Sequence, residues 1–241
     1  ILVSNTRNLI LKYNKCFERS PIDLIINGKF KMSSITKEKT VSYFKNLSNH
    51  FKIIEVWLPQ FGEFILKQVL IDDKSELSKY KSPKKPKWIT YGSSITQCKD
   101  SLSPSKTWPA VVARKRNYDL TCLGYGGQCH LDILISIIIR DMDADLISLC
   151  LGINIYGSNS LNKRSLFSNI IGFINIIREK HFKTPIVLIS PIYSPRREKN
   201  INSVGLNLKK IRLIISDIVK ILYQRGDKNI YYINGLKIFN S

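Results

Sequence analysis

Three short segments carry the residue types that acyl-transfer chemistry requires. Gly92-Ser93-Ser94-Ile95-Thr96 offers hydroxyl groups, Gly124-Tyr125-Gly126-Gly127 is rich in glycine, and Gly152-Ile153-Asn154 ends in an amide side chain. Attack on a carbonyl carbon needs a nucleophile such as a serine hydroxyl, together with N–H donors for the negative charge that develops on oxygen. Because the three segments supply both kinds of group, they are candidates for one site.

Each of these segments directly follows an apolar run that is typical of a buried strand. In an open α/β sheet, ligands bind beyond the carboxyl ends of the strands, so residues just after the strands share one edge. Taken singly, each segment reads as a helix cap or a tight turn. Three such segments after three successive strands favour a functional site.

Other known sites with similar residues match less well. The α/β-hydrolase elbow G-x-S-x-G fails because Thr96 occupies the place of its last glycine. A dinucleotide fingerprint starting at Gly124 needs glycine where Cys129 stands, and a P-loop Gly-Lys-Ser/Thr is absent. A flavin-phosphate loop built on the hydroxyls of Ser93 and Ser94 is conceivable, but it would lack internal glycines.

The order of these motifs makes the stretch from Trp88 to Phe239 resemble an SGNH (GDSL-type) hydrolase. In that family a GDS-[LI] block holds the nucleophile. Ser94 aligns with this nucleophile, and Ser93 stands in place of the usual Asp. The second block matches at the oxyanion-hole glycine, Gly127, although Cys122 replaces the Asn that usually begins it.

The third family block, Gly-x-Asn, is matched fully by Gly152-Ile153-Asn154. Further stretches resemble a bacterial subgroup with an N-terminal β-domain: Thr107-Trp108-Pro109-Ala110, Cys129-His130-Leu131-Asp132 and Ser190-Pro191-Ile192-Tyr193.

The resemblance implies a serine ester hydrolase that works through an acyl-enzyme, with carbohydrate acetyl groups as one substrate class. Ser94 Oγ would attack the ester carbonyl, and water would later release the acid. The backbone N–H groups of Ser94 and Gly127, with the side-chain amide of Asn154, would bind the oxyanion. No cofactor and no metal are implied, and the expected partner is a small-molecule or carbohydrate ester.

The sequence lacks the general base that must take the Ser94 proton. The family places this base in a D-x-x-H block after the fifth strand, and no D-x-x-H occurs in the 241 residues. We therefore expect a truncated fragment of an esterase that is inactive or impaired. The alternative is a non-catalytic pseudoenzyme that binds a ligand or carbohydrate on the same scaffold, with Arg196 and Arg197 as candidate contacts.

Three histidines could replace the missing base. His50 lies in the N-terminal region, and His181 precedes a strand on the edge opposite Ser94, where a helix-end role is expected. His130 is on the same edge as Ser94, but no carboxylate that could orient it is evident. A loop role is therefore favoured for His130.

From residue 88 onward, apolar strands alternate with amphipathic helices. This alternation predicts a three-layer αβα domain with a parallel five-stranded sheet, as in SGNH or flavodoxin-like folds. The expected strands are 88–91, 120–123, 146–151, 186–189 and 230–233, and the expected helices are 107–116, 131–140, 165–180 and 208–222.

Before about residue 80, short β-type runs are separated by polar turns, and Asn27-Gly28 is a strong hairpin signal. This pattern predicts a small β-sandwich-like domain with strands at 9–13, 22–26, 29–32, 40–44, 51–58 and 64–71. The expected domains are 1–78 (β-rich, incomplete), 79–87 (a Lys/Pro linker) and 88–241 (a C-terminally truncated esterase domain).

Composition excludes several other classes. The net charge of +20 is spread along the chain, without the clustered basic face and stacking aromatics that nucleic-acid binding needs. The five cysteines form no CxxC pair, which argues against a disulfide framework or a zinc site. No apolar run reaches the ~18 residues of a membrane span, and no signal peptide is visible. The compartment stays open, with the cytoplasm as the default, and so does the oligomeric state.

Overall fold

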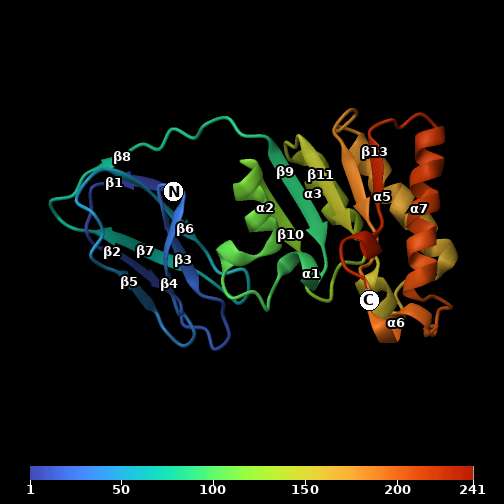
Figure 1. The fold of residues 1–241 in the computed structure, drawn as a ribbon, viewed down its shortest axis with the longest axis horizontal. Helices are drawn as coiled ribbons and strands as arrows, with labels where there is room; N and C mark the ends of the chain where they lie inside the picture. Colours follow the sequence, from blue (N-terminus) through green and yellow to red (C-terminus); the bar gives the residue numbers. More distant parts are fainter. Residues whose placement is uncertain (241) are drawn as a thin grey trace. The chain divides into compact units, whose positions relative to one another are not determined.

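The computed structural model describes residues 1–240, which form two compact units (Figure 1). The first unit comprises Ile1–Lys84 and Cys98–Val111, and the second comprises Lys85–Gln97 and the chain from Val112 onward. The short segment after residue 97 thus leaves the second unit and packs with the first. Each unit has its own core, and we describe the two separately.

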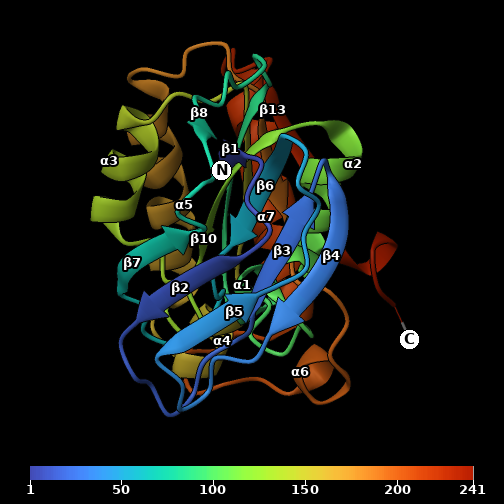
Figure 2. The ribbon, with the colours of Figure 1, turned by 90° about the vertical axis from the view of Figure 1, so that its left-hand side faces the viewer.

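The first unit contains two antiparallel sheets (Figure 2). Their facing sides bury an apolar core, to which β2 contributes Leu9, Leu11 and Tyr13, because alternate residues of a strand point to one face. One sheet has the order β4 (Lys29–Ser34), β3 (Ile22–Ile26), β6 (Lys52–Trp57), β1 (Leu2–Ser4), β8 (Leu77–Ser78), and the other β5 (Val41–Phe44), β2 (Leu9–Tyr13), β7 (Leu66–Ile71). The prediction of a small β domain is confirmed.

The second unit is built on a parallel five-stranded sheet, which confirms the predicted fold class. The middle strands are nearly all apolar because both faces of the sheet are covered; Ile147, Leu149 and Leu188 are fully buried. The strand order is β10 (Asp119–Gly124), β9 (Lys87–Gly92), β11 (Leu146–Cys150), β12 (Ile186–Ile189), β13 (Ile230–Ile233).

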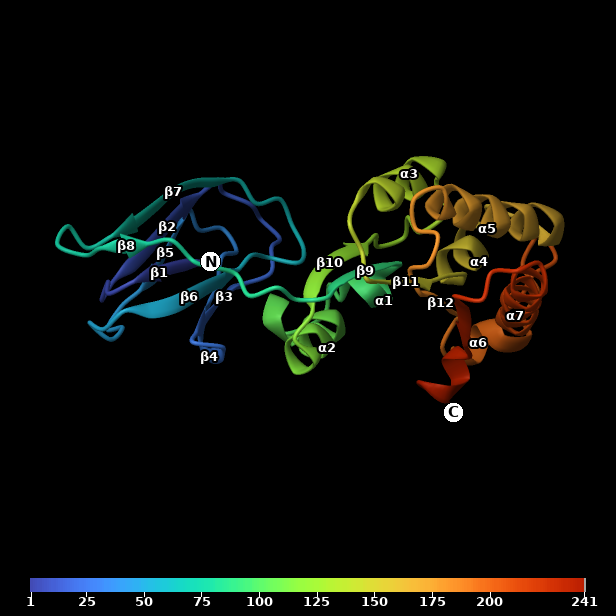
Figure 3. The ribbon, with the colours of Figure 1, turned by 90° about the horizontal axis from the view of Figure 1, so that it is seen from above.

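Helices connect these strands. Figure 3 shows α3 and α5 on one side of the strands and α2 on the other, and α5 also contacts α7. The helices are α1 (Ser94–Gln97), α2 (Trp108–Arg116), α3 (Ile133–Asp141), α4 (Ile153–Ser158), α5 (Lys163–Arg178), α6 (Pro195–Lys199) and α7 (Leu208–Gln224), with 3-10 turns η1 (Pro104–Lys106) and η2 (Gly235–Lys237).

The longest helix, α7, shows how the sequence sets local structure. Asn207 precedes it, and the side chain of Asn207 accepts a hydrogen bond from Lys210 N at 2.9 Å, which caps the helix start. Ile211, Ile215 and Ile218 recur at three- and four-residue spacings and are fully buried. Burial of such a side chain is worth about 1.5–3 kcal/mol.

The structure adds short elements that the sequence pattern did not predict, among them β1, β8, α1, α4 and α6. The helix expected at 131–140 begins later, at Ile133, because Leu131 has a left-handed backbone with φ of 66°. Across residues 1–240, no helix is both long and apolar enough to cross a membrane.

Candidate active site

The strand order locates the site in the second unit. From β9 the chain moves to β10 on one side and later returns to β11 on the other, so the connections diverge between β9 and β11. The crevice at such a switch point, beyond the carboxyl ends of the strands, is where open α/β sheets bind ligands. Gly92 of β9 is paired with Cys150 of β11 at this edge, so the segments holding Ser94 and Asn154 begin side by side.

Ser94 is the first residue of α1, directly beyond β9, and its side chain is exposed. The preceding residue, Ser93, is buried, and its carbonyl oxygen accepts hydrogen bonds from the N–H groups of Thr96 (2.9 Å) and Gln97 (3.0 Å). The Ser93 hydroxyl also accepts a hydrogen bond from Ile95 N at 3.2 Å. Ser93 thus shapes the turn that presents Ser94 to solvent.

The glycine-rich segment after β10 lies against Ser94. A Cβ atom built on Gly126 would lie 3.7 Å from Ser94 Cβ. Two hydrogen bonds hold this loop to the nucleophile segment: Tyr125 N donates to Gly92 O at 2.7 Å, and Gly126 N donates to Gln97 Oε1 at 3.1 Å. The structure therefore brings the first two predicted segments together.

Asn154, in the first turn of α4, joins the third segment to the same loop. The backbone N–H of Cys129 donates to Asn154 Oδ1 at 3.1 Å. Because an N–H group needs an acceptor, this bond fixes which end of the amide is oxygen and leaves Nδ2 as the opposite end. Gly152 precedes α4 with φ of 111°, and a Cβ there would lie 2.6 Å from Ile211 Cγ2, so this position requires glycine.

Three N–H donors remain open at this edge. Within residues 1–240, neither the backbone N–H of Ser94, nor that of Gly127, nor Nδ2 of Asn154 donates a hydrogen bond to the protein. Gly127 has φ of 75°, a conformation that glycine adopts without strain. An acyl-transfer site needs such N–H donors, together with a hydroxyl nucleophile, to stabilise the oxyanion.

His130 is on the expected edge, but both of its ring nitrogens are already bonded. Nε2 lies 3.0 Å from Gly127 O, and Nδ1 lies 3.0 Å from Ser160 Oγ. Since a carbonyl oxygen only accepts, Nε2 carries a proton, and in the neutral ring Nδ1 then accepts a hydrogen bond from the Ser160 hydroxyl. His130 therefore holds the Gly127 loop, as its predicted loop role requires.

The other two histidines lie elsewhere. His181 is buried between the end of α5 and β12, at the amino edge of the sheet, with Nε2 3.1 Å from Ile139 O and Nδ1 3.2 Å from Thr184 Oγ1. His50 is an exposed residue of the first unit. Each ring nitrogen of His181 thus has a structural partner at the edge opposite Ser94.

Two thiols near the site, those of Cys129 and Cys150, are not alternative nucleophiles. Burial raises the pKa of Cys129 to about 12 and that of Cys150 to about 11. Both side chains therefore stay protonated at neutral pH, whereas the thiolate is the reactive form. Burial also raises the pKa of Tyr91, whose hydroxyl accepts a hydrogen bond from Leu131 N at 3.2 Å and supports the end of the loop.

Sequence reasoning missed the residues that hold the loop. Gln97 lies one helical turn after Ser94, a spacing that could have indicated it. Ser160 and Tyr91 gave no signal, because their contacts arise only when α4, β9 and the loop meet in three dimensions. Among residues 1–240, no cluster of three or more His, Cys, Asp or Glu side chains could hold a metal ion.

The fold and the strand-end motifs together define an α/β acyl hydrolase of the SGNH type. A family model described as GDSL-like lipase/acylhydrolase matches residues 84–241, and the chain belongs to this family. No curated protein sequence matches the chain.

Solved structures resemble the chain over nearly its whole length. The salicylyl-acyltransferase SsfX3 of a tetracycline biosynthetic pathway is 29% identical, with a TM-score of 0.90, over 99% of this chain and 70% of that one. A putative GDSL-like lipase from Bacteroides ovatus is 22% identical, with a TM-score of 0.81, over 97% of this chain and 72% of that one. An acetyl xylan esterase from Butyrivibrio proteoclasticus is 14% identical, with a TM-score of 0.69, over 96% and 79%. The last two likenesses concern the fold only.

Proposed function

We propose that the chain provides the acylation centre of a serine ester hydrolase. Ser94 Oγ attacks the ester carbonyl, its proton passes to a base, and the alcohol leaves as the acyl-enzyme forms. Water then attacks the acyl carbon and releases the acid. The observation that carries this proposal is that Gly126 packs against Ser94 while Asn154 is hydrogen-bonded into the same loop.

In this mechanism the open donors bind the developing oxyanion. These are the backbone N–H groups of Ser94 and Gly127 and the Nδ2 group of Asn154. Each acts from a fixed position, because Gln97, His130 and Cys129 hold the loop and the amide in place. Such fixed dipoles stabilise the transition state without reorganisation during the reaction.

We further propose that neither His130 nor His181 acts as the base. The nitrogens of His130 and His181 are bonded to the protein, and neither residue is hydrogen-bonded to Ser94. The 241-residue chain is therefore expected to hydrolyse esters poorly without an external base.

The proposed substrate class is an acyl ester of a carbohydrate, with acetyl as the acyl group. A structural neighbour named as an acetyl xylan esterase supports this class. The neighbour named as a salicylyl-acyltransferase supports a second acceptor for the acyl group. A hydroxyl compound, rather than water, would then take the acyl group from Ser94.

Chemical rescue tests this proposal. Imidazole in solution can accept the Ser94 proton, so turnover of 4-nitrophenyl acetate by the protein should rise with imidazole concentration, above the rate of imidazole alone. Ser94→Ala should remove this increment. Equal increments for both proteins would rule out Ser94 as the nucleophile.

A second candidate function is ligand binding without catalysis on the same scaffold. The engaged ring of His130 favours it, because an inactive site can retain a rigid loop without a base. If imidazole produces no Ser94-dependent turnover but a carbohydrate ester still binds, this second function is the correct one.

A further inference from the structure

The carboxyl edge of the second unit carries exposed cations on four elements. They lie on α6, in the first turns of α5 and α7, and in η2. We name these residues the basic rim: Lys163, Arg164, Arg196, Arg197, Lys199, Lys209 and Lys237. Among residues 1–240, none of them forms an ion pair.

Carboxylates are scarce at this edge. In the segments 92–97, 124–133, 150–165, 190–210 and 234–240, the acidic side chains are those of Asp132 and Glu198. Glu198 lies on α6 among the arginines, yet it is paired with the buried Arg212 through two contacts of 2.6 Å. The Arg212 guanidinium lowers the pKa of Glu198. Because the Glu198 carboxylate is already paired with Arg212, its negative charge does not neutralise the basic rim.

The cations are also placed against the helix dipole. Lys163, Arg164 and Lys209 occupy the first turns of α5 and α7, which contain no acidic residue. A helix start carries partial positive charge, so cations there are unfavourable for folding. A general excess of lysine would not concentrate cations at helix starts. Their position there suits a surface that binds anions.

At the amino edge, four cations (Lys87, Arg140, Arg178 and Lys180) have carboxylate partners, while others, such as Arg116 and Arg225, form no ion pair within residues 1–240. Lys87 pairs with Asp143, and Arg178 forms a two-point pair with Asp227. Arg140 is bonded to both Asp141 and Glu179.

Hydrogen bonds join the basic rim to the element that carries Asn154. The hydroxyl of Tyr156 in α4 donates to Asn200 O at 3.1 Å, just after α6. Asn202 Nδ2 donates to Tyr156 O at 2.9 Å. The α6 segment is therefore fastened to the same short helix that holds the proposed oxyanion donor.

We propose that the basic rim binds anionic groups of the substrate, so that the ester presented to Ser94 belongs to a molecule with clustered phosphate or carboxylate groups. The inference rests on the proposed function, because Ser94 and Asn154 mark the reacting centre. Guanidinium groups bind phosphate and carboxylate through paired hydrogen bonds, and clustered cations speed the arrival of an anionic substrate.

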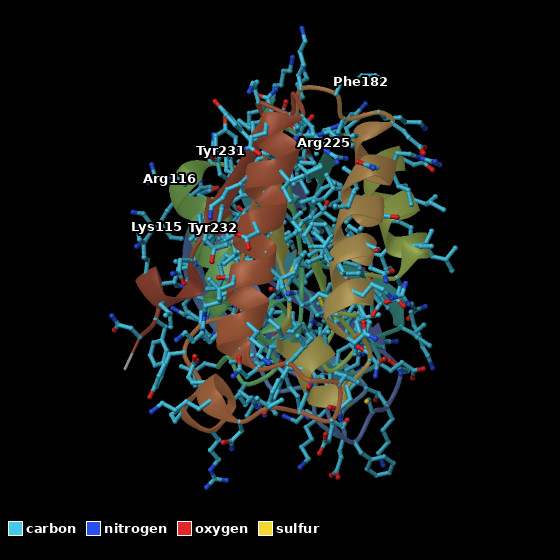
Figure 4. The ribbon with its side chains drawn as sticks, turned by 90° about the vertical axis from the view of Figure 1, so that its right-hand side faces the viewer. Lys115, Arg116, Phe182, Arg225, Tyr231 and Tyr232 are labelled. Atoms are coloured by element: carbon cyan, nitrogen blue, oxygen red, sulfur yellow. The ribbon has the colours of Figure 1, made fainter. Side chains whose placement is uncertain are left out.

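Inorganic tripolyphosphate and trigalacturonate, measured by calorimetry at low salt, are suitable probes for the two chemistries. The rim variant is Arg196→Gln/Arg197→Gln/Lys199→Gln. The matched control, Lys115→Gln/Arg116→Gln/Arg225→Gln, removes the same charge from exposed side chains that lie far from α6 (Figure 4). We expect the rim variant to bind the preferred probe about tenfold more weakly, while the control changes binding less than about twofold.

Equal weakening in both variants, or no binding of either probe by the parent protein, would overturn the basic rim as an anion site. The preferred probe distinguishes phosphate from carboxylate substrates. Since this binding needs no reaction at Ser94, its loss leaves the proposed nucleophile untouched. Conversely, rim-dependent binding without any Ser94-dependent turnover would contradict the proposed function alone. Circular dichroism and melting curves establish that each variant is folded.

Discussion

Cys129 and Asn154 form the hydrogen bond that ties two strand-end segments into one site, with Cys129 N donating to Asn154 Oδ1 at 3.1 Å. The bond comes from a backbone N–H group and orients the amide of Asn154. In the mechanism that we propose, Asn154 therefore has two separable roles, as an acceptor within the fold and as a donor toward the substrate.

Substitution of Asn154 should separate these two roles. Asn154→Asp keeps an acceptor for Cys129 N but removes the N–H donor, so Ser94-dependent turnover should fall by about 10²–10³-fold. Asn154→Ala also leaves the Cys129 N–H without its acceptor and should lower the free energy of unfolding by a further ~1–2 kcal/mol. Urea unfolding and imidazole-supported kinetics measure the two effects. Unchanged turnover in Asn154→Asp would exclude the amide as an oxyanion donor.

His130 should behave as a positioning residue. In His130→Gln the amide Nε2 group can still donate to Gly127 O, so this variant should retain more turnover than His130→Ala, which loses the bonds to Gly127 and Ser160. We expect a loss of about tenfold or more for alanine. If both variants lost all activity alike, and the pH profile of the parent showed a group that both lack, His130 would be the base.

Alanine substitutions of the glycines near Ser94 should lower the free energy of unfolding by different amounts, depending on what the added methyl group meets. A Cβ on Gly124 would lie 2.3 Å from the backbone N of Gln97, so Gly124→Ala must displace α1 and should cost about 1–3 kcal/mol. At Gly126 the collision, at 2.6 Å, is with the movable Gln97 Oε1, so Gly126→Ala should cost less. Gly172→Ala, in open space on α5, is the control and should stabilise by about 0.5–1 kcal/mol. Chemical unfolding would refute the account if Gly126→Ala were the most damaging.

The pair of Glu198 and Arg212 should make stability depend on acid pH. The pKa of Glu198 is lowered by Arg212, so its contribution is present above the ordinary pKa of glutamate, about 4.3, and is lost as the pH falls through the lower folded-state pKa. Glu198→Gln should destabilise by about 3 kcal/mol at pH 7, because Arg212 stays buried without its partner. This difference should shrink toward pH 3.

A control for the acid dependence is Asp217→Asn, whose partner Lys220 lies in an exposed pair. It should change stability by less than about 0.5 kcal/mol at either pH. Equal effects of the two substitutions in denaturant titrations would mean that the Glu198 pair contributes no more than a surface contact.

The first turn of α7 offers a test of the helix-dipole argument. Lys209 is exposed there, so Lys209→Glu should raise the free energy of unfolding by about 0.3–1 kcal/mol at low salt. Lys209→Gln should give a smaller rise. A decrease in melting temperature for the glutamate variant would contradict the view that this cation opposes folding.

Much of the second unit could be predicted because most of its strands are short apolar runs. Ile186–Ile189 and Ile230–Ile233 were expected at the residues where β12 and β13 lie, since an unbroken apolar run leaves little choice of register. The helices α4 and α6 were missed. They are short, and contacts such as that between Tyr156 and Asn200, which no local pattern encodes, hold them in place.

The same limit applies to the site. Ser94, Gly127 and Asn154 were predicted from their order along the chain, and the strand topology then brings their segments to one edge. The partners that hold these residues, such as Gln97 and Ser160, depend on backbone atoms that approach only after folding. The sequence does not predict such contacts, because a polar residue at those positions is equally compatible with exposure to solvent.

The most direct test of the central claim is to locate a covalent adduct. The protein, treated with a fluorophosphonate in the presence of imidazole and then digested, should carry the phosphonyl group on the peptide that contains Ser94, and fragmentation should place it on Ser94 itself. Ser94→Ala should remain unlabelled under the same conditions. A phosphonyl group on another residue, or equal labelling of Ser94→Ala, would contradict the assignment of Ser94 as the nucleophile.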